Sequence, residues 1–178
     1  LDLEGIYYQQ FPERYFPSVV RASHILGHVK EVDKSIRETI EDKNEYELGD
    51  MIGWNGLERK YEHYLKGKRG VYFYEVDALG REVGLVEDLP SKNPEPGQNI
   101  ITTLEINIQK KLENIMEESR GVIIVGIPET GEILGAVSAP DFRPDLFTGL
   151  MLEDDWQHVL KHPDKPLINR FNQGLYPP

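Results

Sequence analysis

The residues of this sequence that could make or break bonds do not form a catalytic pattern. The chain has no cysteine, which excludes thiol nucleophiles, disulfides and cysteine-ligated zinc sites. No serine stands in a Gly-x-Ser-x-Gly or Ser-x-x-Lys pattern, the settings that typically activate a serine hydroxyl for attack. The serines are Ser18, Ser23, Ser35, Ser91, Ser119 and Ser138. We therefore expect no catalytic residue among these 178 residues.

Three other polar patterns are better explained by structural roles than by chemistry. His24 and His28 have the i, i+4 spacing of helical metal ligands, but Gly27 lies between them and no third ligand is near. The basic stretch 66–70 lacks the first glycine of a phosphate-binding loop and suits the glycine-capped end of a helix. The acidic run 153–155 is typical of a helix N-terminus. These patterns predict no metal site and no phosphate site.

The composition predicts a folded, acidic protein. Hydrophobic residues make up 39% of the chain and charged residues 29%, values that argue against wholesale disorder. The net charge of −11 repels phosphate backbones and anionic lipids, so nucleic acid is not expected as a partner. No run approaches the ~18 apolar residues of a membrane span. Because the sequence starts with Leu1 rather than Met, we expect it to be part of a longer chain.

Two short helices are predicted in the first half of the sequence. Asp33 is placed to cap a helix that should end near Asn44. A second helix is expected between Gly56 and Gly67, where Gly67 is the stop signal. Its apolar face would be formed by Leu57, Tyr61, Tyr64 and Leu65.

A β-hairpin and a connector follow these helices. The run 71–76 is rich in aromatic and β-branched residues, and 81–83 resumes that pattern after a turn at 77–80. This succession predicts two paired strands. The stretch 87–99 contains three prolines and a glycine, which makes it the best candidate for a connector or domain boundary.

An aromatic-rich segment at 5–16 precedes all of these elements. Its partial alternation, interrupted by Pro12, predicts an extended segment at the edge of a sheet. The aromatic side chains could bind a partner, or they could equally let a thin domain bury one face. They are Tyr7, Tyr8, Phe11, Tyr15 and Phe16.

The second half of the sequence predicts a helix, two strands and a further helix. Together with the elements of the first half, these predict an α+β fold. The strands are expected at 122–127 and 132–137, both apolar enough for burial on two faces. A short helix should run over 154–160 and end before Pro163. The first helix should extend to about Ser119 on an apolar stripe of Leu104, Ile108, Leu112 and Ile115.

Several segments, taken in their order along the chain, match one family. The strongest signature is a Gly-Leu-Glu helix within 49–62, followed by a Leu-Lys-Gly stop at 65–67. The other matches are Arg14-Tyr15-Phe16-Pro17 with the trailing His24-x-x-Gly27, then 75–81, 96–109, 121–140 and 166–178. Together these segments resemble class B penicillin-binding proteins of the penicillin-binding protein 2 type. The chain departs from the pattern at Leu104-Glu105, where that family often has Ile-Asp.

The resemblance implies two domains. Residues 1–99 would form the pedestal, or dimerisation, domain, an elongated arrangement of short helices and β-hairpins. Residues 100–178 would form the first helix and hairpin of a transpeptidase domain that contains an α/β sheet. The transpeptidase domain would be incomplete in this chain, because only its N-terminal part is present. The structural motif residues that the resemblance singles out are Arg14, Gly53, Leu57, Glu58, Tyr61, Gly67, Asp77 and Arg81.

The implied activity of the parent protein is D,D-transpeptidation of peptidoglycan by serine acyl transfer. The run 166–178 resembles the lead-in to Gly-Ser-x-x-Lys, so the nucleophilic serine is expected just after Pro178. These 178 residues alone are therefore expected to be inactive. The resemblance implies no cofactor, and it implies that β-lactams acylate the same serine.

The implied partners are peptidoglycan stem peptides, a membrane glycan polymerase and cell-shape scaffold proteins. The parent would be held in the cytoplasmic membrane through an anchor outside this chain, with these residues on the periplasmic side. Tyr7, Tyr8 and Phe11 are the expected partner-binding residues. The alternative is a non-catalytic extracytoplasmic docking module.

An electrostatic cluster is the expected link between separated segments of the pedestal. Arg14 and Glu58 lie in two different matched motifs, and Asp77 and Arg81 lie in a third. An arginine held by carboxylates from a helix and a hairpin would fix their mutual orientation. We therefore expect a carboxylate of Glu58 or Asp77 within about 4 Å of Arg14.

Overall fold

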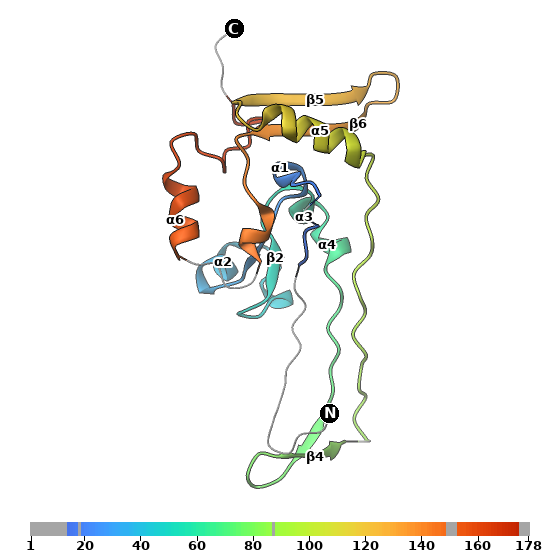
Figure 1. The fold of residues 1–178 in the computed structure, drawn as a ribbon. Helices are drawn as coiled ribbons and strands as arrows, with labels where there is room; N and C mark the ends of the chain where they lie inside the picture. The colour runs from blue at the N-terminus through green and yellow to red at the C-terminus, as the bar shows by residue number, and fades with distance from the viewer. Residues whose placement is uncertain (1–13, 18, 87, 149–152, 175–178) are drawn as a thin grey trace. The chain divides into compact units, whose positions relative to one another are not determined.

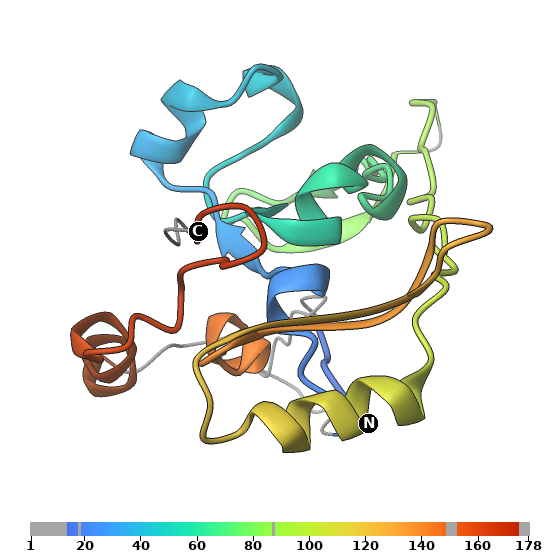
Figure 2. The same cartoon turned by 90° about the horizontal axis from the view of Figure 1, so that it is seen from above.

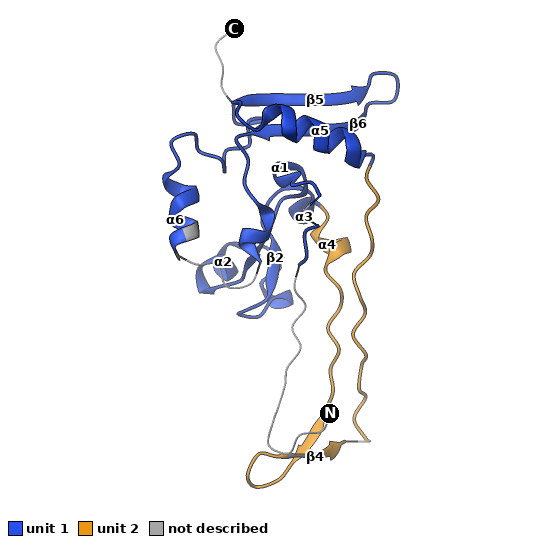
Figure 3. Ribbon diagram, viewed as in Figure 1, with its two compact units in different colours: residues 1–60, 103–178 blue, residues 61–102 orange. Residues whose placement is uncertain are grey.

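The computed structural model describes residues 14–17, 19–86, 88–148 and 153–174. It divides into two compact units, which Figure 3 distinguishes by colour. Unit 1 comprises residues 1–60 and 103–178, and unit 2 comprises residues 61–102. The expected boundary between residues 99 and 100 stays a prediction. Residues 5–13 of the expected aromatic segment, with Tyr7, Tyr8 and Phe11, lie outside the described residues, whereas Tyr15 is described and is 81% exposed.

The first part of unit 1 is built from short elements around a small apolar cluster. Strands β1 and β2 pair antiparallel, with Val29 opposite Gly53. The cluster consists of Val32, Ile36 and Tyr46, with Ile40 and Ile52 packed against it. The elements are α1 (Ser23–Leu26), β1 (Val29–Glu31), α2 (Lys34–Thr39), the 3₁₀ turn η1 (Lys43–Glu45), β2 (Met51–Gly53) and α3 (Gly56–Lys60).

The predicted cap of helix α2 is confirmed, but the predicted end of that helix is wrong. The Asp33 side chain accepts a hydrogen bond from the Ile36 N–H at 2.7 Å. The helix ends at Thr39 rather than near Asn44, because Ile40 adopts extended backbone with ψ of 145°. The following residues form the separate turn η1.

Three glycines allow the elements of this part to approach closely. A Cβ on Gly27, whose φ is 82°, would lie 2.0 Å from the Asn55 carbonyl oxygen. A Cβ on Gly53 would lie 2.3 Å from the carbonyl oxygen of Glu58. A Cβ on Gly56 would meet the Gly27 nitrogen at 2.6 Å. The approach of α1, β2 and α3 therefore requires residues without side chains.

The second part of unit 1 is a helix lying along a hairpin. Helix α5 (Ile106–Met116) is followed by β5 (Gly121–Ile127) and β6 (Glu132–Ala139), which pair antiparallel. Figures 1 and 2 show α5 running along the hairpin. Their shared apolar cluster is formed by Leu112, Met116, Val137 and Ala139, with Ile108, Ile123 and Val125 packed against it.

The helix and both strands were predicted, but two details of their burial are wrong. Ile115 was assigned to the apolar face and is exposed, because the buried face of α5 instead contains Gln109 and Glu113 beside Leu112 and Met116. The strands are not buried on two faces along their length, since Ile124 is 56% exposed. Only the second half of β6 is fully buried.

Unit 1 ends with two short helical elements. The 3₁₀ turn η2 (Pro144–Phe147) follows β6, and helix α6 (Glu153–Lys161) comes next. The helix predicted over 154–160 is therefore confirmed, with one more residue at each end. Within the residues that the structure describes, no helix is long and apolar enough to cross a membrane.

Unit 2 contains α4 (Glu62–Leu65) and the predicted hairpin, formed by β3 (Tyr74–Val76) and β4 (Glu82–Leu85). Asp77 stabilises the turn by accepting hydrogen bonds from the N–H groups of Leu79 and Arg81, at 2.8 and 3.0 Å. Gly80 adopts the left-handed backbone that the turn requires, with φ of 79°.

The prediction of one helix between Gly56 and Gly67 is wrong. The chain breaks at Tyr61, whose φ of −113° and ψ of 20° are not helical, and α3 and α4 are separate. Gly67 does not cap a helix with left-handed backbone, because α4 ends at Leu65 and Lys66 is extended. A Cβ on Gly67 would instead lie 2.3 Å from the Glu95 carbonyl oxygen.

The position of Gly67 reflects pairing between two extended stretches of unit 2. Isolated antiparallel bridges join Lys68 to Glu95 and Val71 to Lys92. The Lys68 ammonium also lies 2.7 Å from the Glu95 carboxylate. The proline-rich stretch that was predicted as a connector is therefore tied back to the residues before the hairpin.

The close approach at Gly27 leads to a prediction with a matched control. Gly27 and Gly49 both have positive φ, at 82° and 93°, but no atom lies within 4 Å of a Cβ built on Gly49. Gly49→Ala should cost about 1 kcal/mol of unfolding free energy through backbone strain alone. Gly27→Ala should cost about 2–4 kcal/mol because the backbone of Asn55 must also move. Urea unfolding measures both, and equal losses would contradict the close packing.

Candidate functional site

Buried polar side chains join four segments of unit 1 that are far apart in the sequence. The segments are 20–28, helix α5, strand β6 with the loop after it, and 163–171. We call this group the polar junction. Its members are Arg21, His24, Gln109, Glu113, Ser138, Asp141 and Arg170, of which all but Arg21 and Asp141 are buried.

Glu113 on α5 binds the backbone of the N-terminal segment. Its carboxylate oxygens accept the Arg21 N–H at 2.9 and 3.0 Å, and Oε1 accepts the Ala22 N–H at 2.8 Å. Oε1 also accepts a hydrogen bond from the Gln109 side chain, at 2.9 Å. Hydrogen bonds to an ionised carboxylate are stronger than neutral ones, so this contact fixes where the segment before α1 meets the helix.

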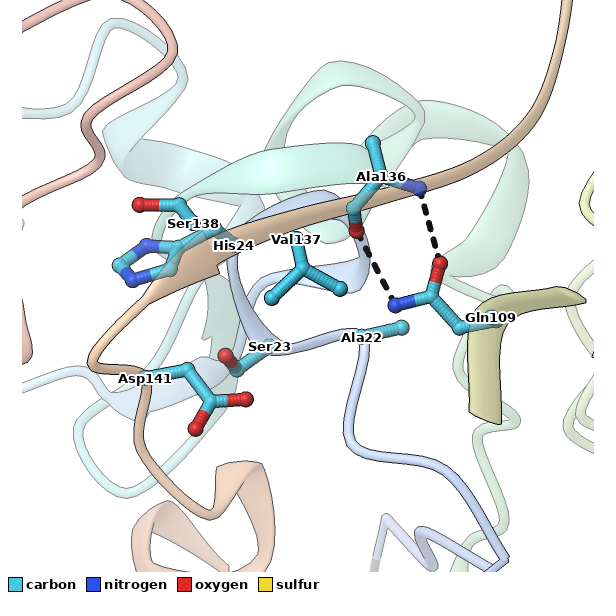
Figure 4. Close-up of a pocket in the computed structure, with 8 residues that line it drawn as sticks. All are labelled: Ala22, Ser23, His24, Gln109, Ala136, Val137, Ser138 and Asp141. Carbon is cyan, nitrogen blue, oxygen red and sulfur yellow. Dashed lines mark hydrogen bonds between the residues drawn. The ribbon is translucent and has the colours of Figure 1, made fainter. Parts of the chain in front are cut away.

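Gln109 binds the backbone of β6 as a neighbouring strand would. Its Oε1 accepts the Ala136 N–H at 2.9 Å, and its Nε2 donates to the Ala136 carbonyl at 3.0 Å. Figure 4 shows the amide facing Ala136 with both bonds drawn. The two hydrogens on Nε2 are thus divided between Ala136 and Glu113.

Arg21 and Asp141 form an ion pair at the edge of the junction. Arg21 Nε lies 2.8 Å from Asp141 Oδ2. Burial raises the pKa of Asp141 above its ordinary value, although the hydrogen bond from Arg21 acts in the opposite direction. Asp141 and Ser23 line a small cavity of about 10 Å³, drawn in Figure 4. This volume is about that of one water molecule, too small for a substrate.

His24 and His28 lie in an aromatic cluster rather than a metal site. Both rings contact Phe142 edge to face, and His28 also stacks on Phe147 at 3.9 Å between ring centroids. His24 Nε2 lies 3.0 Å from the Pro166 carbonyl oxygen. Because a carbonyl only accepts, His24 carries its proton on Nε2.

Burial keeps both histidines neutral. It lowers the pKa of each from 6.5 to about 4. For His24, the hydrogen bond to Pro166 opposes this effect and the charge of Arg170 adds to it. For His28, the charge of Lys30 adds to the effect of burial. Neither ring is poised to exchange protons near neutral pH.

Arg170 is a buried cation that binds carbonyl oxygens. Its Nη1 donates to the carbonyls of Ile168, Lys165 and Pro140 at 3.3, 3.4 and 3.5 Å, and its Nη2 donates to that of Asp164. Among the described residues its guanidinium contacts no carboxylate. Ser138 Oγ accepts the Arg170 N–H at 3.0 Å.

The junction orients backbone and contains no group arranged for bond breaking. Ser138 Oγ bonds to backbone groups of Ile168 and Arg170, and His24 binds a carbonyl, so neither forms a nucleophile and base pair. Within the described ranges, no three His, Asp or Glu side chains are grouped to hold a metal ion. The role that this arrangement supports is structural, because His24, Ser138 and Arg170 hold the backbone of segment 163–171 in place.

The motif residues picked from the sequence lie elsewhere. Arg14 Nη2 lies 2.9 Å from Glu58 Oε2 in unit 1, as expected. Asp77 pairs with Arg81 at 2.7 Å in unit 2. A direct link between the two pairs stays a prediction. The other motif residues are Gly53 at the end of β2, Leu57 in α3, Tyr61 between α3 and α4, and Gly67 after α4.

Sequence reasoning did not identify the members of the junction as a group. The signal that could have found two of them is their spacing, because Gln109 and Glu113 are i, i+4 and lie on the face that also carries Leu112 and Met116. Arg170 carries no comparable signal. It is one arginine in an irregular segment, and only the folded chain surrounds it with carbonyls.

This chain is similar in sequence and in fold to known proteins. Residues 1–102 match the family described as the penicillin-binding protein dimerisation domain. The chain belongs to this family. It is 34% identical over 177 residues to the peptidoglycan D,D-transpeptidase MrdA of Salmonella typhimurium, a match that covers 98% of this chain. The chain spans 28% of the length of that curated relative.

Solved structures of related proteins have a similar fold. A complex between penicillin-binding protein 2 and MreC from Helicobacter pylori aligns with a TM-score of 0.76 and 32% identity, covering 93% of this chain and 30% of the other. Penicillin-binding protein 2 of Pseudomonas aeruginosa aligns with a TM-score of 0.72 and 29% identity, covering 98% and 34%. The mixed helix and sheet fold predicted from the sequence is thus confirmed at this level.

The buried histidines predict that stability falls in mild acid. In the unfolded chain His24 and His28 bind protons near pH 6.5, but in the folded chain only near pH 4. Between these values the unfolded state holds more protons, so unfolding free energy should fall as pH falls, by up to about 1.4 kcal/mol per pH unit for each histidine. Thermal melting from pH 8 to 4 measures this loss. The double variant His24→Phe/His28→Phe should flatten the slope, and an unchanged slope would assign the loss to other groups.

Proposed function

We propose that this chain is part of a peptidoglycan D,D-transpeptidase of the penicillin-binding protein 2 type. The observation that carries the proposal is the 34% identity, over almost the whole chain, to a protein named for that activity. The match includes residues beyond 102, outside the dimerisation domain. The segment 163–171, held by buried hydrogen bonds, overlaps the start of the run 166–178 that resembles the lead-in to the nucleophile.

The reaction that we propose for the parent is serine acyl transfer. A serine just after Pro178 attacks the D-Ala-D-Ala peptide bond, releases the terminal D-Ala, and passes the acyl group to an amine of a neighbouring stem peptide. A lysine in the same motif aids the proton transfers. The residues described above supply no reacting group and act by holding the backbone that leads to the serine.

Under this proposal the chain has two domains on the periplasmic side of the cytoplasmic membrane. Residues 1–99 form the pedestal and residues 100–178 begin the transpeptidase domain. The exposure of Ile124 on β5 supports the second assignment, because an apolar strand face is normally covered by further strands or helices. An anchor outside this chain holds the protein in the membrane.

Acylation by a fluorescent penicillin tests the proposal. The full-length protein should gain one covalent adduct, at a serine just past Pro178, because a β-lactam acylates the same nucleophile as the peptide. A chain that ends at Pro178 should gain none. Intact-mass analysis reads out both. An adduct on the shorter chain would contradict the placement of the nucleophile, and a folded full-length protein without an adduct would favour the docking-module alternative.

We also propose that the parent binds a cell-shape scaffold protein. The structure from Helicobacter pylori is described as a complex of penicillin-binding protein 2 with MreC. In unit 2, the hairpin exposes apolar side chains that suit such a contact, with Leu79 79% exposed and Val83 68% exposed. The expected contribution of Tyr7, Tyr8 and Phe11 stays part of this proposal, as does a glycan polymerase partner.

Substitutions on the hairpin test this contact. Leu79→Ser and Val83→Ser should each raise the dissociation constant for the scaffold protein of the same organism about tenfold, because each removes apolar area that binding would bury and adds a hydroxyl that binding would desolvate. Ile101→Ser, at another exposed apolar position of unit 2, is the matched control and should change nothing. Binding is measured by calorimetry. Equal affinities of all three variants and the wild type would remove the hairpin from the interface.

A further inference from the structure

The segment 163–171 has little regular structure of its own. Two backbone hydrogen bonds, from Lys165 to His162 just before the segment and from Ile168 to Lys165 within it, each close a single turn. No helix or strand is assigned to it. Its path therefore depends on side chains that bind its backbone groups from other elements.

Arg170 fixes this path from within the segment. It is 9% exposed, and its guanidinium gathers the carbonyls of Asp164, Lys165 and Ile168 together with that of Pro140 after β6. A buried guanidinium is costly unless its N–H groups are satisfied, and here the described residues offer only carbonyl oxygens. The rigid fork of five donors thus ties four backbone positions to one another.

Two other elements hold the same segment from outside. Ser138, near the end of β6, accepts the Arg170 N–H at 3.0 Å, and its hydroxyl is 3.5 Å from the Ile168 carbonyl. His24 of α1 donates to the Pro166 carbonyl across 142 sequence positions. The backbone of α1 is in turn set by Glu113, which binds the two residues before it.

We propose that His24, Ser138 and Arg170 are positioning residues for the acyl-transfer nucleophile. This inference rests on the proposed function. The held segment ends at Phe171, seven residues before Pro178 and the expected serine beyond it. A displacement of about 1 Å at a reacting group can lower the rate about a hundredfold. Through His24, the N-terminal segment acts on the nucleophile without touching substrate.

The test uses the full-length protein and two readouts, the second-order rate constant for acylation by a fluorescent penicillin and hydrogen exchange of backbone amides. His24→Phe keeps an aromatic ring against Phe142 but removes the donor to Pro166. Its acylation should be about tenfold slower, the order expected for one lost buried hydrogen bond, and the amides of 167–173 should exchange faster. His24→Gln, which can restore a donor, should recover part of the rate.

His28→Phe is the matched control. His28 is as buried as His24, contacts the same Phe142 ring and has the same lowered pKa. Among the residues that the structure describes, however, its side chain forms no hydrogen bond to segment 163–171. Its acylation rate should stay within about twofold of the wild type. If His28→Phe slows acylation as much as His24→Phe, the effect is general destabilisation and the inference fails.

Arg170→Lys provides an independent arm. A lysine ammonium donates from a single point and cannot span the four carbonyls, so acylation should fall by about tenfold or more. Arg143→Lys is its control, because Arg143 is exposed and pairs with its neighbour Asp145. If His24→Phe does not fold, Arg170→Lys and His24→Gln decide the question.

The outcomes separate this inference from the proposed function. A folded wild-type protein that is not acylated contradicts the proposed function, and with it the role in catalysis. A wild type that is acylated, with His24→Phe and Arg170→Lys acylated at the same rate and unchanged exchange at 167–173, contradicts the inference alone. Slower acylation in both variants, with faster exchange confined to that segment, supports it.

Discussion

The carboxylate of Glu113 is the contact on which the arrangement of unit 1 depends. It is buried on α5 and binds the N–H groups of Arg21 and Ala22, which precede it by 92 and 91 positions. A buried carboxylate without hydrogen bonds would be strongly destabilising, so the N-terminal segment must follow this path for the helix to pack on its hairpin. Helix α1 begins directly afterwards, and the position of His24 follows from it.

Polar contacts of this kind specify the fold because the apolar clusters are small. One cluster contains Val32, Ile36 and Tyr46, and the other is centred on α5 and the end of β6. Apolar burial is not directional, and small clusters tolerate several arrangements. Hydrogen bonds of fixed geometry, such as those from Gln109 to Ala136, select one of them. Glycines at the approach of α1, β2 and α3 permit it sterically.

The same contacts hold backbone groups, and the polar junction contains no group arranged for bond breaking. Membership of the penicillin-binding protein dimerisation domain family accounts for residues 1–102. The residues after them form a helix, a hairpin and the segment that Arg170 and Ser138 hold. The polar junction sets the positions of backbone groups, at the energetic cost of burying a cation and the neutral His24.

The sequence by itself determined the local elements and the family. The cap at Asp33, the turn at Asp77 to Gly80, both hairpins and the apolar spacing in α5 are local signals, because capping, turn geometry and periodicity act over a few residues. Tertiary structure decided the close approach at Gly67 and the burial of Gln109, Glu113 and Arg170. Gly67 approaches Glu95, Gln109 binds Ala136, Glu113 binds Arg21 and Arg170 binds Ser138, each across more than two dozen positions. Polar residues are mostly exposed, so burial of these side chains follows only from the partners that the fold supplies.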